Sequence, residues 1–464
     1  MSTDVFTLRT PVPVSADALF AWHARPAAFF RLVPPWEQVT PVAVKGPFGN
    51  GQTVTVRTPI FGPIQKTWTA ELYDVEPGRR FRDRQLHGPF AAWNHTHEMI
   101  PDGPDRSTLE DHVEYRVPLG LLGHALGAGG VRHRLSALFA YRHALTESDL
   151  RRHAQFHDRP RLRVMITGAR GLIGADLSLF LAAGGHEVVR LTRGAVAPSS
   201  FDDGTTTVTW NPDAPDPALF EGVDAVVHLA GDSLAAGRWD DAKKARILES
   251  RTGPTRRLAE AIAKSGRPKV FVCASAVGFY GDRGDEELDE SSRRGTGFLA
   301  DVCEEWEAAT EPAGRAGARV VNTRFGVVLS PKNGALAKQL PAFRAGGGAV
   351  LGAGTQWLSW VSIGDVVGAL HHALMTEALA GPVNVVTPFP VTNREFGRVL
   401  ARVLSRPYLL TVPAPALRVL FGEMADSALL ASTRVVPRRL AETGFQFDYP
   451  RLEDALRFVL GRLN

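Results

Sequence analysis

Residues 163–193 read RVMITGARGLIGADLSLFLAAGGHEVVRLTR, and this stretch decides the fold. The apolar run at residues 164–166 is typical of a buried parallel strand. A glycine turn follows at once, and residues 172–183 carry apolar side chains at helical spacing. Residues 187–191 are apolar again and predict a second strand. Strand, glycine turn, helix and strand in this order predict a nucleotide-binding unit.

Each glycine of the turn has a predicted role. Gly168 allows the tight turn, Gly171 lets the backbone approach a pyrophosphate, and Gly174 lets the helix pack close to the strand. The helix N-terminus then offers N–H groups and a partial positive charge to the phosphates. The residues of this turn predicted to bind the cofactor are Gly168, Arg170, Gly171, Leu172, Ile173 and Gly174.

The end of the second strand indicates which dinucleotide binds. A carboxylate at this position would accept a hydrogen bond from the ribose 2′-hydroxyl of NAD. This chain has Thr192 and Arg193 instead, and an arginine suits the 2′-phosphate of NADP by charge and geometry. The alternative interpretation of Arg193 is a solvated surface side chain. We expect NADP as the cofactor.

Composition bounds the remaining classes of function. The chain has 464 residues, of which 44% are hydrophobic and 22% charged, as in an ordinary globular protein of two or three domains. No apolar run of about 18 residues predicts a membrane span, and no secretory signal is visible. Cys273 and Cys303 have no metal-type spacing, so we expect free thiols in the cytoplasm. The net charge is +4 and the arginines are scattered, so nucleic-acid binding is not expected.

Residues 1–150 predict an α+β domain. A strand near residues 5–9 precedes a helix with Ser15 as its N-cap, and five further strands are expected between residues 52 and 117. Asp111 falls on the apolar face of the last of these strands. A long helix with apolar residues at helical spacing closes the domain. The basic residues 151–161 are then expected to form a solvated linker.

The order of these elements resembles the START-like (SRPBCC, helix-grip) superfamily over residues 3–150. The matching motifs lie at residues 34–36, 88–90, 93–97 and 109–115. The resemblance implies a curved sheet around the last helix and a cavity for an apolar small molecule. His95 and His97 point the same way on one strand, as two metal ligands would. They also fit hydrogen-bonded histidines near a cavity, and because no third ligand can be assigned, we expect no metal.

The second block alternates strands and helices from residue 162 onward, which predicts a doubly wound parallel sheet. One strand ends in Leu229, Ala230 and Gly231, where small residues leave room for the adenine and ribose of the cofactor. Arg251 follows on a helix and is expected to reach a cofactor phosphate. Ser275 ends another strand, at the edge where a nicotinamide would lie; its alternative role is to satisfy loop backbone.

These motifs resemble the extended short-chain dehydrogenase/reductase (NAD-dependent epimerase/dehydratase) family, and more narrowly its epimerase-family branch. The resemblance covers residues 162–464 and rests on residues 167–174, 228–231, 238–239, 250–251, 275–281, 306–307, 324–329 and 359–365. It implies an α/β Rossmann fold of residues 162–405 and a small C-terminal domain of residues 406–464. We therefore predict a Rossmann doubly wound parallel sheet fused, through a linker at residues 151–161, to an N-terminal α+β helix-grip domain.

The catalytic tyrosine and lysine of the wider family are missing. None of the six tyrosines is followed by lysine at the fourth position, and the usual spacing from Ser275 leads to residues 298–299, which are Phe-Leu. Tyr280 is the only tyrosine in the predicted active-site loops, so it is the candidate proton donor; its alternative role is a packed aromatic ring. The other candidates are Glu304, Glu305 and Glu307, which are expected to face solvent.

The sequence thus predicts an NADP-dependent oxidoreductase or epimerase-like protein that acts on a small molecule. Ser275 and Tyr280 are its candidate catalytic residues. The alternative is a catalytically silent NADP(H)-binding sensor or a ligand carrier, which the missing tyrosine and lysine favour. No nucleic-acid or membrane partner is expected.

Overall fold

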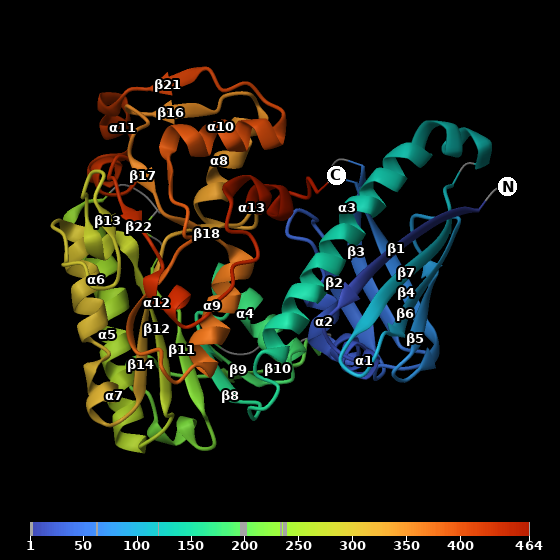
Figure 1. Ribbon diagram of the computed structural model, residues 1–464, viewed down its shortest axis with the longest axis horizontal. Coiled ribbons are helices and arrows are strands. Elements are labelled where there is room, and N and C mark those ends of the chain that lie inside the picture. Colours follow the sequence, from blue (N-terminus) through green and yellow to red (C-terminus); the bar gives the residue numbers. More distant parts are fainter. Residues whose placement is uncertain are drawn as a thin grey trace.

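The computed structural model describes residues 3–61, 64–118, 120–194, 202–232, 234 and 239–463, without the side chains of residues 60–61 and 120–128. Arg238, part of a predicted motif, lies outside the described residues. Two seven-stranded sheets lie side by side and are joined by the long helix α3 (Gly120–Ala154) (Figure 1). None of the described helices is long and apolar enough to cross a membrane.

The first sheet is antiparallel, with strand order β1-β7-β6-β5-β4-β3-β2. Its strands are β1 (Asp4–Val12), β2 (Thr40–Lys45), β3 (Thr53–Phe61), β4 (Ile64–Glu76), β5 (Arg80–His87), β6 (Ala92–Pro101) and β7 (Ser107–Arg116). Burial alternates along β7, which confirms the predicted apolar face with Asp111 on it. Helices α1 (Ala16–Ala24) and α2 (Pro26–Arg31) connect β1 to β2, and Ser15 caps α1 as predicted.

Helix α3 covers one face of this sheet. Leu135 and Phe139 of α3 pack in one cluster with Trp93, Val113 and Tyr115 of the sheet. The burial of these large side chains stabilises the sheet–helix contact by roughly 1.5–3 kcal/mol each. An antiparallel sheet against a closing helix is the α+β architecture that the sequence predicts.

The second sheet is parallel, with strand order β10-β9-β8-β11-β12-β14-β19. Its strands are β8 (Arg163–Thr167), β9 (Glu187–Thr192), β10 (Thr205–Thr209), β11 (Ala225–His228), β12 (Val270–Ala276), β14 (Arg319–Phe325) and β19 (Gly381–Val385). This confirms the Rossmann doubly wound sheet. The chain reverses its direction of winding between β8 and β11, and ligands of such sheets bind at this switch point.

Helices cover both faces of the parallel sheet (Figure 1). Helices α4 (Leu172–Ala183) and α9 (Ile363–Met375) pack on one face, and α5 (Asp241–Ser265), α6 (Phe298–Ala308) and α7 (Glu311–Arg315) on the other. Strand residues alternate between the two layers: Val164 and Ile166 pack toward α4, while Met165 packs toward α5. The central strands β8 and β11 are buried on both faces, which explains their continuous apolar runs.

A third group of elements lies beyond the carboxyl edge of the parallel sheet. It contains helices α8 (Gly334–Arg344), α10 (Asn393–Leu404), α11 (Ala414–Phe421), α12 (Arg438–Glu442) and α13 (Leu452–Val459), and small sheets of β13 (Glu287–Leu288), β15 (Val327–Leu329), β16 (Ala349–Leu351), β17 (Trp357–Leu358), β18 (Trp360–Ser362), β20 (Val391–Thr392), β21 (Leu410–Val412) and β22 (Arg434–Val435). Strand β21 pairs with β16, and β22 pairs with β13. The residues from 406 onward therefore form their sheets with earlier parts of the chain.

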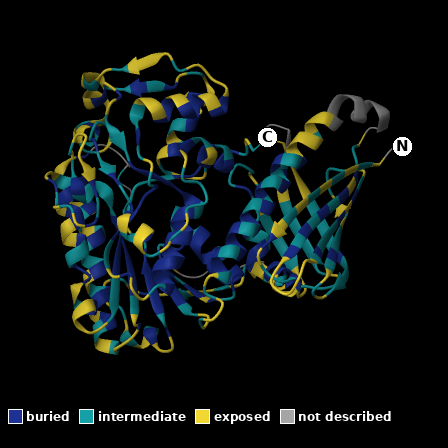
Figure 2. Cartoon of the chain, in the orientation of Figure 1, coloured by how far each residue is buried: buried dark blue, intermediate teal, exposed yellow. Residues whose placement is uncertain are grey.

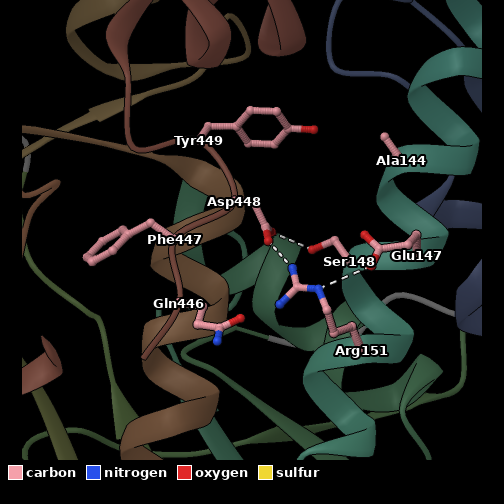
Figure 3. Close-up of a pocket in the computed structure, with 8 residues that line it drawn as sticks. All are labelled: Ala144, Glu147, Ser148, Arg151, Gln446, Phe447, Asp448 and Tyr449. Atoms are coloured by element: carbon pink, nitrogen blue, oxygen red, sulfur yellow. Dashed lines mark hydrogen bonds and ion pairs between the residues drawn. The ribbon is translucent and has the colours of Figure 1, made fainter. Parts of the chain in front are cut away.

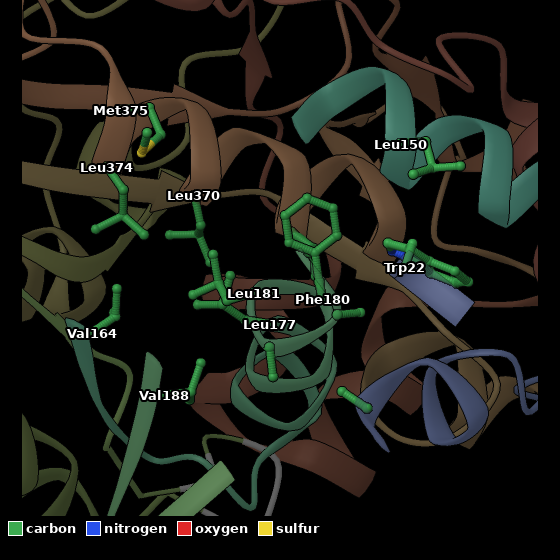
Figure 4. Close-up of a cluster of buried hydrophobic side chains, with 14 of the residues drawn as sticks. Trp22, Leu150, Val164, Leu177, Phe180, Leu181, Val188, Leu370, Leu374 and Met375 are labelled. Carbon is green, nitrogen blue, oxygen red and sulfur yellow. The ribbon is translucent and has the colours of Figure 1, made fainter. Parts of the chain in front are cut away.

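The two large sheets share one apolar core. Trp22 of α1 and Leu150 of α3 lie in the same cluster as Leu177 and Phe180 of α4 and Leu370 of α9 (Figure 4). Figure 2 shows buried residues continuing from the parallel sheet through α4 and α9 to the lower end of α3. The junction between the two parts is therefore packed like a protein interior.

The prediction of a solvated linker at residues 151–161 is wrong for its first residues, which belong to α3. Helix α3 continues to Ala154, and Arg152 and His153 are only 4% and 5% exposed. Arg152 forms ion pairs with Asp365 of α9 at 2.8 Å and with Asp448 at 2.6 Å. Because both carboxylates come from distant parts of the sequence, the local basic stretch gave no sign of them. A cavity of about 310 Å³ beside Arg151 and Asp448 marks this junction (Figure 3).

Candidate functional site

The glycine turn between β8 and α4 has the predicted tight geometry. Gly168 adopts φ +66°, a conformation that disfavours residues with a side chain. A Cβ atom at Gly168 would lie 2.7 Å from the carbonyl carbon and oxygen of Leu229, at the end of β11. The turn and the end of the neighbouring strand thus approach to backbone contact, at the switch point of the sheet.

Helix α4 begins directly against this turn. A Cβ atom at Gly174 would lie 2.4 Å from the carbonyl oxygen of Gly168, so only glycine permits this contact. Gly171 is the exposed N-cap residue and makes no side-chain capping bond. The first turn of α4 therefore has no side-chain cap from its N-cap residue, which suits an anion site. Leu172 and Ile173 are half-buried and contribute their side chains to the apolar packing.

Two arginines lie at the end of β9. Arg170 of the turn is exposed, and its guanidinium donates a hydrogen bond to Thr192 Oγ1. Arg193 follows Thr192 and is exposed as well. The sequence placed Arg193 here but did not predict that Arg170 lies beside the same strand end. Two guanidinium groups near the 2′-position of a bound ribose would attract a phosphate more strongly than one.

The ends of β8 and β11 are held together by buried polar groups. Thr167 Oγ1 lies 2.7 Å from His228 Nδ1, and the backbone N–H of Leu229 donates to the same hydroxyl oxygen at 3.2 Å. Burial lowers the pKa of His228 to about 4, so the imidazole is neutral. These bonds fix Leu229 and Ala230 beside the glycine turn. Gly231, the next residue, is exposed.

Arg251 lies next to Gly231 but is already bonded. Its guanidinium donates to the carbonyl oxygens of Asp232 at 2.9 Å and Ile247 at 3.0 Å, and it stacks over the ring of Trp306. The side chain is only 8% exposed. The predicted contact of Arg251 with a cofactor phosphate thus competes with bonds that hold the loop after β11 against α5.

A chain of hydrogen bonds occupies the carboxyl edge of β12 and β14. Ser275 Oγ donates to Glu307 Oε1 at 2.7 Å. Arg324 donates to both carboxylate oxygens of Glu307, at 2.7 and 2.8 Å, and to the hydroxyl oxygen of Tyr280 at 2.9 Å. The Tyr280 hydroxyl in turn donates to Asn384 Oδ1 at 2.8 Å. One bidentate ion pair thus links the two predicted catalytic residues.

Tyr280 lies in the interior and not on an open loop. Its side chain is fully buried and belongs to an apolar cluster with Leu288, Val386 and Val435. Burial raises the pKa of Tyr280 to about 12. The structure therefore favours the alternative role that the sequence left open, a packed aromatic ring, over a proton donor.

The glutamates of α6 divide into two kinds. Glu304 and Glu305 are exposed, as predicted. The prediction that Glu307 faces solvent is wrong, because its carboxylate points inward to Ser275 and Arg324. The buried Cys303 lies one helical turn earlier on the same face of α6, and this spacing is a signal that could have identified Glu307.

Comparison with known proteins identifies the family. The model of the NAD dependent epimerase/dehydratase family matches residues 164–386, and a domain of unknown function, DUF1731, matches residues 412–459. The epimerase family protein Mb2239 of Mycobacterium bovis is 44% identical over 301 residues, which are 64% of this chain and 98% of that protein. This chain belongs to the NAD-dependent epimerase/dehydratase family. Human epimerase family protein SDR39U1 is 34% identical over 303 residues, 64% of this chain and its full length.

Two solved structures extend this result. A nucleoside-diphosphate sugar epimerase from Corynebacterium glutamicum covers 98% of this chain and 90% of its own, with a TM-score of 0.79 and 33% identity. Human SDR39U1 (isoform 2), solved with NADPH, covers 65% of this chain and all of its own, with a TM-score of 0.59 and 33% identity. The predicted epimerase-family resemblance is confirmed, whereas both family models lie after residue 163 and leave the START-like resemblance a prediction.

Proposed function

We propose that this protein binds NADP(H) at the β8–α4 turn. The observation that carries the proposal is the backbone contact of Gly168 with Leu229 next to the uncapped N-terminus of α4. This geometry accommodates a pyrophosphate. Arg170 and Arg193 at the end of β9 favour a 2′-phosphate, and the human relative was solved with NADPH.

The proposed activity is oxidoreductase or epimerase-like chemistry on a small molecule, and a nucleoside-diphosphate sugar is the first class to test because of the Corynebacterium relative. Since the tyrosine and lysine of the wider family are missing, we assign the polar role to Ser275 and Glu307. Ser275 would orient a substrate oxygen, and the Glu307 carboxylate, bonded to that hydroxyl, would accept its proton. Arg324 holds Glu307 in place.

The second candidate is a silent NADP(H) binder or ligand carrier. The burial of Tyr280 favours this second candidate, because a buried Tyr280 does not present its hydroxyl to a bound nicotinamide. In either case we propose a cytoplasmic protein in which residues 1–150 form a START-like ligand-binding unit, residues 162–405 bind the cofactor, and residues 406–464 form the small C-terminal unit. No nucleic-acid partner is proposed.

Calorimetric titration with NADPH and NADH tests the cofactor site. Arg193→Glu should weaken NADPH binding at least tenfold relative to NADH, because it places a negative charge beside the 2′-phosphate. Arg256→Glu, an exposed arginine on α5, is the matched control and should change neither affinity. Equal weakening of both cofactors by Arg193→Glu would refute the role given to Arg193. Absence of NADPH binding by the unaltered protein would refute the proposed function.

Turnover separates the two candidates. Unaltered protein is incubated with NADPH or NADP and with carbonyl compounds and nucleoside-diphosphate sugars, and both cofactor redox state and sugar epimers are followed. Activity that falls at least 100-fold in Ser275→Ala and in Glu307→Gln, with NADPH affinity retained, would support the enzymatic role. Tight NADPH binding without turnover of any of these compounds would support the silent binder.

A further inference from the structure

Four ionisable side chains form a row on one face of the antiparallel sheet. Asp83 of β5 lies directly opposite His95 of β6, and His97 of β6 lies directly opposite Asp111 of β7. His95 and Asp111 are 3% exposed. Two carboxylates and two imidazoles in the interior of a small domain are costly to bury, which makes the row a candidate functional site.

Three ligand atoms converge at the Asp83 end of this row. Asp83 Oδ2 lies 3.0 Å from His95 Nδ1 and 3.6 Å from His97 Nε2, and each of the three residues offers a ligand atom within 4.8 Å of the other two. Tetrahedral ligands at about 2.1 Å from a zinc ion are about 3.4 Å apart, so these spacings need little adjustment. The second oxygen of Asp83 accepts a hydrogen bond from Trp93 Nε1 at 3.2 Å, which orients the carboxylate.

Asp111 holds the opposite edges of both imidazoles. Its Oδ1 atom lies 3.1 Å from His95 Nε2 in a hydrogen bond and 2.6 Å from His97 Nδ1. His97 Nδ1 nevertheless has no hydrogen-bond partner of acceptable geometry. Asp111 Oδ2 is bonded to His143 Nε2 of α3 at 2.9 Å. A carboxylate behind the ligand histidines is the usual arrangement at metal sites, where it fixes the tautomer and ring orientation.

We propose that Asp83, His95 and His97 bind one divalent transition-metal ion, with Asp111 as the positioning carboxylate. Two imidazole nitrogens and one carboxylate oxygen suit Zn²⁺, Fe²⁺ or Mn²⁺. The side chains of Asp83 and His97 are 16% and 12% exposed, so the ion can enter from this side and keep water at its remaining positions. The inference departs from the sequence-based expectation of no metal, because Asp83 supplies the third ligand that the sequence did not assign.

A second histidine cluster in the described residues fits a metal less well. His153, His186 and His371 are buried and close together, and each has a nitrogen without a partner. The backbone N–H of Leu162, however, donates to His186 Nδ1 at 3.1 Å. A neutral His186 therefore carries its proton on Nε2, the nitrogen that a metal would need. This group also contains no carboxylate to balance a cation.

Metal binding by the full-length protein tests the proposal. The protein is treated with a chelator, dialysed, and titrated with Zn²⁺ in competition with a chromophoric chelator of micromolar affinity. We expect one tightly bound Zn²⁺ per chain. His95→Gln and His97→Gln should each lower the Zn²⁺ affinity at least 100-fold, and Asp111→Asn should lower it roughly 10- to 100-fold. X-ray absorption of the zinc complex should show two imidazole ligands.

Two matched variants locate the ion. His112→Gln, on the opposite face of β7 where His112 meets Thr7, should bind Zn²⁺ as the unaltered protein does. His371→Gln, an equally buried substitution in the other histidine cluster, should also retain it. The proposal is overturned if the unaltered protein binds no Zn²⁺, if His95→Gln and His97→Gln retain it, or if His371→Gln alone loses it. Should His95→Gln not fold, the partly exposed His97→Gln and the absorption spectrum still decide.

Discussion

The hydroxyl group of Tyr280 is enclosed by Arg324 and Asn384, and it links the ion pair at Glu307 to the last strand of the parallel sheet. A group with both hydrogen bonds used inside the protein contributes to stability and not to proton transfer. Its removal leaves two buried polar partners unsatisfied, at a cost of about 1–3 kcal/mol.

Tyr280→Phe should therefore lower the melting temperature by several degrees and leave NADPH affinity unchanged. Differential scanning calorimetry and calorimetric titration measure the two quantities. If the unaltered protein turns over a substrate, Tyr280→Phe should do so at the same rate. A variant of normal stability that has lost turnover would show instead that Tyr280 is the proton donor.

Gly171→Val should abolish binding of both NADPH and NADH without unfolding the protein. Gly171 has φ −73°, an ordinary value, and among the described residues the only close neighbour of an added Cβ is the carbonyl oxygen of Gly168 at 3.1 Å. The valine side chain would instead fill the space in front of α4, where we place the pyrophosphate. Gly130→Val on the exposed side of α3 serves as control, and circular dichroism verifies folding. Tight cofactor binding by Gly171→Val would discredit the assignment of this turn.

The sequence predicted the roles of residues that are set by local backbone shape. It missed the roles of residues whose partners lie far away in the sequence. Gly168 and Gly174 were recognisable because their spacing follows from a tight turn and a close helix. Glu307 was misplaced because its partner Arg324 lies on another strand. Asp83 was overlooked because its relation to His95 appears only when the strand register is known.

Helix α3 belongs to both halves of the molecule. Its middle packs on the antiparallel sheet, and its last turn inserts Arg152 between Asp365 at the start of α9 and Asp448. The carboxylate of Asp365 also accepts hydrogen bonds from the hydroxyl of Ser362, the N-cap residue of α9, and from the backbone N–H of Asp448. These bonds join three elements that are far apart in the sequence.

Arg152→Met should destabilise the protein by about 3–5 kcal/mol, because it leaves the carboxylate of Asp365 buried without its cation and Asp448 with Arg151 alone. Arg151→Met removes a neighbouring arginine that is 26% exposed, and should cost much less. Urea unfolding of both variants measures the difference. Equal stability of the two variants would mean that the buried ion pairs at Arg152 contribute no more than surface pairs.

Strands and helices were predicted correctly where the apolar residues followed a single clear repeat along the sequence. The strict alternation in residues 107–116 and the apolar run in residues 164–166 gave β7 and β8 correctly. Strand β10 was not predicted, since its sequence TTTVT is mostly polar and it lies at the edge of the sheet. The end of α3 was mistaken for a linker because charged residues normally indicate solvent, whereas here they are paired.

On the scale of the whole molecule, one apolar core spans both sheets, and three histidines lie buried within the junction. Burial lowers the pKa of His186 to about 4 and those of His153 and His371 well below the usual value, and Arg161 adds repulsion at all three. The unfolded chain binds protons at these positions below pH ~6.5, while the folded protein does not. Stability therefore falls as the pH decreases.

Between pH 6.5 and 4, the lowered pKa of His186 alone should reduce the free energy of unfolding by about 3 kcal/mol. Urea unfolding measured at intervals from pH 7.5 to 4.5 should show this loss, and His186→Asn should flatten the slope. His157→Gln, which replaces an exposed histidine just after α3, should leave the slope unchanged. An identical slope in His186→Asn would contradict the assignment.

The shared core also determines whether the N-terminal part can be removed from the rest of the chain. Relatives such as human SDR39U1 correspond over their full length to only 64% of this chain. In this chain the imidazole of His153 stacks on Phe180, and the guanidinium of Arg25 donates to the carbonyl of Ala183, so the outer surface of α4 is covered by the N-terminal half. Cutting the chain at residue 161 would expose that apolar surface to solvent and promote aggregation. A fragment that begins at residue 162 should therefore dissolve better when the exposed apolar side chains of α4 are replaced by polar ones.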